Sequence, residues 1–369
     1  MKRIGQLFGE IVEYENLYAA YKEAIKGKRY KPEILRFTQN LEENLIILQN
    51  ELIHNMYRVS PYRQFFVLEP KRRLIMSLPF RDRVVQWSIY QTLLPIYERT
   101  FIYDSYACRK GKGSHRAVAR LQHWIRKDFK GGGYCLKLDI AKYFYRVDHQ
   151  ILLSIIERKI KDKRLLGLIH SIISSESDLF GVELGDHQYV KGRVRGIGMP
   201  IGNLLSQLCA NIYLNELDQF AKHTLKIKHY MRYMDDVLVL HDDKKVLREL
   251  LFEIDCFLKD ELHLSINNKT SIRPISHGID WVGYRVFRTH IRMRKSTAIR
   301  MKRRVKYLTR QYSKGRVNGD AVLRTLRSYD GLMKHGDCHA LRKKLYRDTV
   351  LVRPSDNETG SVEDARGLD

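Results

Sequence analysis

Cysteines are few in this sequence, and it lacks the features of a secreted or membrane-bound chain. The five cysteines, at positions 108, 135, 209, 256 and 338, are widely separated and include no Cys-x-x-Cys pair. They indicate reduced thiols, and neither a disulfide framework nor a zinc site. No apolar run reaches the roughly 18 residues that a membrane helix needs. The first residues also lack an apolar signal core. We therefore expect a cytoplasmic protein with no membrane partner.

Acidic residues are also in the minority. The chain has 42 Asp and Glu against 67 Lys and Arg, which gives a formal net charge of +25. Such an excess indicates a polyanionic partner, although it says nothing about fold. The hydrophobic content of 44% is typical of a folded globular protein. A length of 369 residues predicts two or three subdomains.

Two of these acidic residues, Asp235 and Asp236, stand side by side between Tyr233-Met234 and the apolar run 237–240. This pattern predicts a β-hairpin with both carboxylates at or near its turn. An exposed acidic turn is the simpler alternative. Adjacent like charges are destabilising unless a cation lies beside them, and carboxylate oxygens suit Mg²⁺. Asp139, at the end of another buried strand, would supply a third carboxylate. Three carboxylates could hold two Mg²⁺ ions about 3.5–4 Å apart, which clamp an in-line phosphoryl displacement.

The hydrophobic periodicity alternates between helical and strand spacing, which predicts an α+β fold. In the first half of the chain we expect helices over 8–58, strands over 62–68 and 73–79 with a basic turn at 70–72, helices over 81–98 and 114–127, a strand over 134–140 and helices over 150–175. Residues 198–207 predict a loop that turns into a helix continuing to about 222. A helix over 244–260, strands over 264–270 and 279–286 that complete the sheet, a helix with Ser296 as its N-cap and a helical pair over 321–346 should follow. The polar residues 353–369 favour disorder.

Basic residues are concentrated in two places that could contact a nucleic acid. A glycine-punctuated loop at 103–116 carries Lys110 and Lys112. The helix after Ser296 repeats apolar residues on one face and places basic residues on the others, among them Arg300, Arg303 and Arg304. A solvated surface helix is the alternative, but beside a duplex such a helix would contact phosphates.

These pieces, in their order and over nearly the whole chain, resemble the reverse transcriptases. Asp139 resembles the first palm carboxylate, and residues 233–236 resemble the Tyr-x-Asp-Asp hairpin. Residues 268–270 and 281–284 resemble two later palm motifs, and 81–86 resembles the fingers helix of bacterial and group II intron relatives. The resemblance implies an RNA-directed DNA polymerase that uses dNTPs, template RNA and nascent cDNA. A nucleic-acid-binding protein with a decayed polymerase fold is the non-enzymatic alternative, but all three carboxylates are present.

One motif departs from the usual family pattern. Where most relatives have Gln-Gly-x-x-x-Ser-Pro, residues 201–207 read Ile-Gly-Asn-Leu-Leu-Ser-Gln. This form is similar to the reverse transcriptases of diversity-generating retroelements, as are residues 106–113 and 328–335. The likeness implies a bacterial or phage-encoded enzyme, error-prone at template adenines, that could work with a small basic accessory protein. The sequence shows no maturase or endonuclease domain, so we do not expect a mobile intron protein. Phage-defence reverse transcriptases are the alternative.

The resemblance implies an α+β right-hand polymerase with fingers, an antiparallel-sheet palm and a helical thumb. The corresponding limits are an N-terminal helical extension at 1–60, fingers at 61–130, palm at 131–150, an insertion at 151–197, palm again at 198–288, a basic thumb at 289–349 and a tail at 350–369.

The resemblance to the reverse transcriptases also implies how the catalytic residues act. Asp139 and Asp235 would bridge two Mg²⁺ ions, Asp236 would assist, and the Ile140 carbonyl would be a further ligand. Lys269 would donate a proton to the leaving group, with a surface lysine as the alternative.

Other residues would bind the nucleotide. Arg73 is a candidate triphosphate clamp, because a guanidinium offers two donors to a phosphate. Phe144 lies five residues after Asp139, where the family places an aromatic steric gate; a core phenylalanine is the alternative. Ile201 and Gly202 would hold the nascent pair by contact alone, unless Ile201 only packs beneath the fingers. The remaining candidates are Gln207 and Tyr233.

Overall fold

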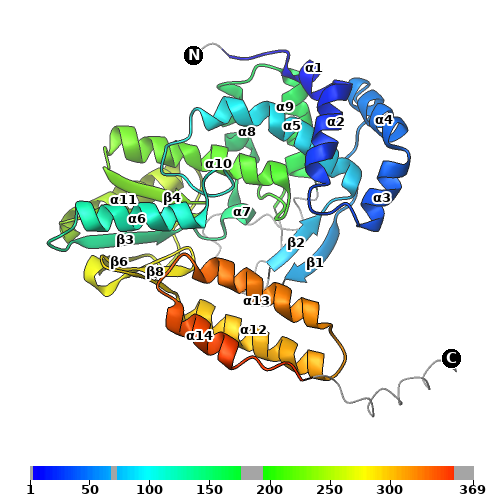
Figure 1. The fold of residues 1–369 in the computed structure, drawn as a ribbon. Coiled ribbons are helices and arrows are strands. Elements are labelled where there is room, and N and C mark those ends of the chain that lie inside the picture. The colour runs from blue at the N-terminus through cyan, green and yellow to red at the C-terminus, as the bar shows by residue number, and fades with distance from the viewer. Residues whose placement is uncertain (1–2, 68–72, 176–193, 353–369) are drawn as a thin grey trace. The chain divides into compact units, whose positions relative to one another are not determined.

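The computed structural model describes residues 3–67, 73–175 and 194–352. These residues form two compact units (Figure 1). The first unit comprises the chain up to Gly113 together with Leu136–Ile272. The second comprises Ser114–Cys135 and the chain from Arg273 onward. The expected turn at 70–72 and the tail at 353–369 lie outside the described residues, as does the region 176–193.

Helices dominate the N-terminal part of the first unit, as the periodicity predicted. They are α1 (Leu7–Val12), α2 (Tyr14–Ala24), α3 (Pro32–Gln39), α4 (Leu41–Ile53) and α5 (Phe80–Glu98). The helices α1, α2 and α3 all pack against α5 (Figure 1). Strands β1 (Arg63–Val67) and β2 (Arg73–Ser77) pair antiparallel, with Phe65 opposite Ile75. The predicted hairpin is therefore confirmed.

A four-stranded sheet with the order β4-β5-β3-β6 carries the acidic hairpin. Its strands are β4 (His229–Tyr233), β5 (Asp236–His241), β3 (Tyr134–Asp139) and β6 (Ser271–Pro274). The helices of this part are α7 (Tyr143–Arg146), α8 (His149–Glu157), α9 (Lys163–Ser174), α10 (Leu204–Gln219), continued by a π-helical turn to Thr224, and α11 (Lys244–Asp260). The central strand β5 is buried from Val237 to Leu240. Burial on both faces explains why this run is continuously apolar.

The strand predicted at 264–270 is wrong. Within 264–270, only Ile266 forms a β-bridge, and its partner is Ile140. The strand itself begins at Ser271. The Asn267 side chain accepts a hydrogen bond from the Lys269 amide at 3.1 Å, and the Thr270 amide donates to the Asn267 carbonyl at 3.0 Å. Asparagine thus bends the chain into a turn before it can extend.

We expected residues 279–286 to complete the four-stranded sheet. They belong instead to a separate sheet in the second unit. Strands β7 (Ile279–Trp281), β8 (Tyr284–Val286) and β9 (Ile291–Met293) form it in that order. Val282 and Gly283 both have positive φ. Two such residues form the tight hairpin turn that matches strand twist, and they fold the segment back on itself.

The helices of the second unit are α6 (Ser114–Lys127), α12 (Lys295–Ser313), α13 (Gly319–Met333) and α14 (His339–Arg347). Met301, Val305 and Leu308 of α12 are buried, whereas Arg303 and Arg304 are exposed and Arg300 is half-buried. Ser296 is not the N-cap: α12 begins at Lys295, and Arg294 precedes it without a side-chain cap. No helix of the described chain combines the length and the apolarity needed to cross a membrane.

Candidate functional site

The acidic hairpin turns at Met234 and Asp235, between paired Tyr233 and Asp236. Met234 has φ +56°, a left-handed conformation that a non-glycine residue adopts at a cost of about 1–2 kcal/mol. The Ile140 amide donates to the Asp235 carbonyl at 3.2 Å, which ties the turn to the end of β3. Asp139, the last residue of β3, therefore lies beside the hairpin tip, as the sequence predicted.

Asp235 lies in an environment that disfavours its charge. Burial, together with the nearby carboxylates of Asp236 and Asp139, raises the pKa of Asp235 from 3.8 to about 6. Its own backbone amide and the guanidinium of Arg73 act in the opposite direction. Arg73 is the first residue of β2, so a positive charge of the β1–β2 hairpin acts electrostatically on Asp235 of the acidic hairpin. A half-buried carboxylate among other carboxylates is a group that a cation would stabilise.

The three carboxylates do not converge as a ready set of ligands. Over residues 3–67, 73–175 and 194–352, no three His, Cys, Asp or Glu side chains are grouped so that they could hold a metal ion. Asp236 instead forms an ion pair with Lys137 of β3, with 3.6 Å between the Lys137 Nζ and the Asp236 carboxylate. The donor chemistry suits a divalent cation, but the side chains would have to turn toward it.

Lys137 was not among the residues singled out from the sequence, although its position in the strand indicated that it lies near Asp139. It lies two residues before Asp139, and alternate residues of a strand share one face. A lysine on the face that carries Asp139 could therefore have been recognised from β3 alone.

The residues expected around the nucleotide are linked through their backbones. The Met199 amide donates to the Phe144 carbonyl at 2.7 Å, and the Met76 amide donates to the Ile201 carbonyl at 3.0 Å. Gly202 has φ +113°, and a Cβ there would lie 3.1 Å from Ile75 Cγ2. Glycine thus lets this loop pass close to β2. Phe144, Ile201 and β2 are brought together, and both side chains are half-buried.

Other predicted residues lie further from this arrangement or already have partners. Lys269 is exposed beyond the Asn267 turn. Lys112 donates to the Tyr103 carbonyl at 2.7 Å and lies over the Tyr103 ring, whereas Lys110 is exposed. Tyr233 and Gln207 are half-buried.

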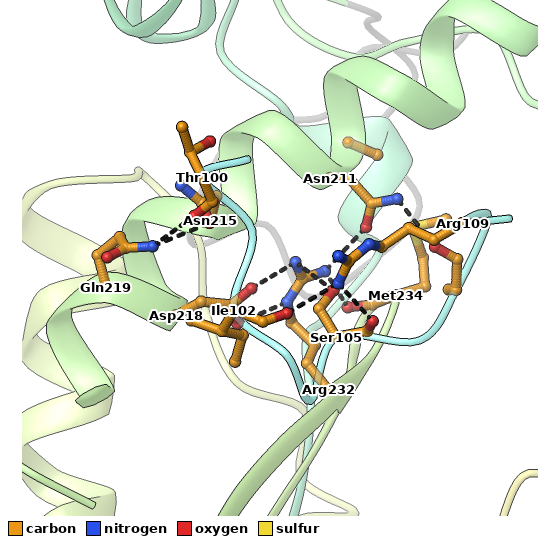
Figure 2. A network of polar contacts seen from close by, with 12 residues as sticks. Thr100, Ile102, Ser105, Arg109, Asn211, Asn215, Asp218, Gln219, Arg232 and Met234 are labelled. Carbon is orange, nitrogen blue, oxygen red and sulfur yellow. Dashed lines mark hydrogen bonds and ion pairs between the residues drawn. The ribbon is translucent and has the colours of Figure 1, made fainter. Parts of the chain in front are cut away.

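Arg232, immediately before the hairpin turn, carries the most extensive set of polar contacts at this site, and sequence reasoning gave it no function (Figure 2). Arg232 and Asp218 of α10 are both fully buried, and the guanidinium donates to both Asp218 carboxylate oxygens, at 2.8 and 2.7 Å. Burial alone would lower the pKa of Arg232, but the Asp218 carboxylate outweighs burial and raises it. An arginine before two aspartates was visible in the sequence, but its distant partner was not.

The chain matches a family model described as "Reverse transcriptase (RNA-dependent DNA polymerase)" over residues 69–286. It is 26% identical over 288 residues to Protein YkfC of Escherichia coli, which covers 68% of this chain and 73% of that protein. It is 31% identical over 272 residues to the group II intron-encoded protein LtrA of Lactococcus lactis, which covers 71% of this chain but only 42% of LtrA.

A more distant overlap is with a solved structure of apo telomerase from Candida tropicalis. The alignment has a TM-score of 0.45 and 13% identity, and it covers 67% of this chain and 59% of that one. An overlap of this size supports no conclusion about function.

The raised pKa of Asp235 predicts a specific effect of pH on stability. Because the folded pKa lies above the unfolded one, the folded state loses stability as pH rises from about 4 to about 6. Asp235→Asn removes this loss. We expect the variant, without added metal, to unfold at a higher temperature than the wild type at pH 7, and the difference to shrink toward pH 5.

Asp242→Asn serves as the control, because Asp242 is an exposed carboxylate just beyond β5. Thermal unfolding followed by circular dichroism should show no pH-dependent difference for it. Equal unfolding temperatures of Asp235→Asn and the wild type at pH 7 would contradict the raised pKa.

Proposed function

Because the chain belongs to the reverse transcriptase family, we propose that it is an RNA-directed DNA polymerase that extends a primer on an RNA template. The observation that carries the proposal is Asp235: a half-buried carboxylate at a hairpin tip whose pKa is raised by desolvation and by two nearby carboxylates, with Arg73 acting in the opposite direction. Carboxylates gathered in this way favour a cation and a phosphate-bearing substrate, and they are otherwise costly to the fold.

The donor chemistry of Asp139, Asp235 and Asp236 fits divalent magnesium, and Asp139 and Asp235 would hold two ions with the Ile140 carbonyl as a further ligand. Bound there, Mg²⁺ supplies stabilisation of the charge that develops during phosphoryl transfer. Lys137 holds Asp236 in an ion pair, which leaves Asp235 and Asp139 as the principal ligands.

The remaining groups bind and orient the nucleotide. Arg73, exposed at the start of β2, would bind the triphosphate. The half-buried ring of Phe144 would lie under the deoxyribose and clash with a 2′-hydroxyl. Lys269 is exposed and would reach the leaving group as a proton donor. The exposed arginines of α12, Arg303 and Arg304, would contact the phosphates of the duplex.

We further propose that the enzyme is error-prone and serves a diversity-generating retroelement. Ile201 is half-buried and is held against β2 through its carbonyl. Isoleucine offers no donor or acceptor to the nascent base pair. A site that recognises its ligand by hydrogen bonds can reject a wrong partner strongly, whereas an apolar surface discriminates by only about 1–3 kcal/mol. A template/variable repeat pair beside the gene would favour this reading, and a defence island would favour a phage-defence enzyme.

Conservative substitution of the carboxylates tests the proposed activity. Asp139→Asn or Asp235→Asn should reduce Mg²⁺-dependent dNTP incorporation on a primed RNA by at least about 100-fold, because metal clamping supplies the transition-state stabilisation. RNA binding should be nearly unchanged. Asp242→Asn is the matched control and should retain activity. Near-wild-type incorporation by either active-site variant would reject the assignment.

Substitution of Ile201 tests the error-prone function. Ile201→Gln should lower misincorporation opposite template adenine more than it lowers total synthesis, since glutamine restores a hydrogen-bonding side chain. Ile201→Leu keeps the side chain apolar and should leave the error rate unchanged. Sequencing of cDNA made by the three proteins on one template provides the comparison. Equal errors per adenine in the glutamine and isoleucine products would exclude Ile201 as the cause.

Salt dependence tests the contact made by α12. Reversing the charge of Arg303 and Arg304 to glutamate should flatten the plot of log affinity against log salt by roughly 0.7–0.9 for each phosphate contact that is lost. Lys244→Glu with Lys245→Glu makes the same change of charge at two exposed positions of α11. If both double variants change the slope equally, the effect comes from net charge and α12 makes no specific contact.

A further inference from the structure

The buried guanidinium of Arg232 uses all of its hydrogen-bond donors. Its Nε donates to Asp218, and its Nη2 donates to Asp218 at 2.7 Å and to Ser105 Oγ at 3.3 Å. Its Nη1 donates to Asn211 Oδ1 at 3.3 Å and to the Met234 carbonyl at 3.1 Å. A guanidinium has five N–H groups, and five acceptors surround this one (Figure 2).

Three separate parts of the first unit meet at this group. Ser105 belongs to the loop before α6, Asn211 and Asp218 belong to α10, and Met234 belongs to the hairpin turn. The backbone of Arg232 joins the same loop, since its amide donates to the Asp104 carbonyl at 3.0 Å and its carbonyl accepts from the Tyr106 amide at 3.0 Å.

The loop that receives Arg232 is itself fixed by side chains. Arg109 donates to the Ile102 and Ser105 carbonyls at 2.8 Å each and forms an ion pair with Glu98 at 2.7 Å. Asn211 donates to the Ala107 carbonyl at 3.0 Å, and Gln219 of α10 donates to the Thr100 carbonyl at 2.8 Å (Figure 2). The loop and α10 are therefore also joined by contacts that do not involve the hairpin.

The contact with Met234 connects this network to Asp235. Met234 is the strained residue of the turn, with φ +56°, and it directly precedes Asp235. A hydrogen bond to its carbonyl fixes the orientation of the peptide bond that leads into Asp235. None of the functions assigned above uses this bond.

We propose that Arg232 is the positioning residue of the catalytic hairpin: clamped by Asp218, it holds the Met234 peptide in its left-handed conformation and so fixes where Asp235 is presented. The proposal rests on the proposed function for its catalytic part, but the positioning itself can be measured without activity. Lysine at 232 would keep the positive charge but offer only three donors on a single nitrogen, so it could not satisfy both Asp218 and Met234 with the same geometry.

The first test compares Arg232→Lys with Tyr230→Phe. Tyr230 donates to the same Asp218 oxygen at 2.8 Å, so its loss also removes a buried hydrogen bond but leaves all five Arg232 contacts intact. Hydrogen exchange measured by mass spectrometry should accelerate at residues 233–236 in Arg232→Lys only. Exchange in α11 should match the wild type in both variants.

The second test measures steady-state dNTP incorporation with the same proteins. Arg232→Lys should lower kcat by about 10- to 100-fold, the usual range for groups that orient metal ligands, with KM for dNTP and RNA affinity within about twofold of wild type. Tyr230→Phe should lower kcat by less than about threefold. Asp218→Asn keeps the shape of the partner but removes its charge, and it should change kcat in the same direction as Arg232→Lys.

The outcomes separate the two proposals. If Asp235→Asn retains activity, the proposed function fails, and the exchange comparison still decides the positioning of the hairpin. If Asp235→Asn is inactive while Arg232→Lys has wild-type kcat and wild-type exchange at 233–236, the positioning proposal is overturned. It is also overturned if Arg232→Lys accelerates exchange in α11 as much as at the hairpin, because Arg232 then only stabilises the fold. Should Arg232→Lys not fold, Asp218→Asn takes its place in both measurements.

Discussion

A charged guanidinium without solvent exposure is tolerated only when every one of its donors is satisfied, and this requirement organises the centre of the first unit. Removing one partner of a buried ion pair typically costs about 3–5 kcal/mol, because the other charge is left uncompensated. Arg232 meets the requirement through Asp218, Asn211, Ser105 and Met234. The loop before α6, the C-terminal half of α10 and the acidic hairpin are consequently fixed together by one side chain.

The hairpin that this network supports is electrostatically unfavourable at its tip. Burial and two neighbouring carboxylates raise the pKa of Asp235 to about 6, and only its own amide and Arg73 oppose them. Lys137 offsets the charge of Asp236 through a partly exposed ion pair, which is a weak interaction. A fold selected for stability alone would not gather these groups. The unfavourable electrostatics are understandable if a cation and a phosphate ligand complete the site.

The sequence predicted those features that depend on local pattern. The bounds of α6 and α11 and the pairing of β1 with β2 follow from periodicity and from turn residues within a few positions. The strand expected at 264–270 does not form because the Asn267 side chain accepts a hydrogen bond from the Lys269 amide, an interaction that competes with extension but leaves the apolar pattern unchanged. Asp139 and Asp235 could be named because Asp139 ends a strand and Asp235 lies in the turn of a hairpin. The Arg232 network could not, since Ser105 lies 127 positions away and Asn211 and Asp218 lie on a different element, so that only the tertiary fold joins them.

Helix α10 connects the two ends of the candidate site. It begins just after Gly202 and carries Asp218 near its other end, so at about 1.5 Å per residue it spans roughly 24 Å. The loop that bears Ile201 contacts β2 and the Phe144 segment, whereas Asp218 contacts the hairpin through Arg232. Nucleotide selection and presentation of the carboxylate are thus assigned to opposite ends of one helix with separate hydrogen-bond partners. On the proposed function, residue 201 can change from a hydrogen-bonding to an apolar side chain and alter fidelity, because the contacts that place Asp235 do not pass through it.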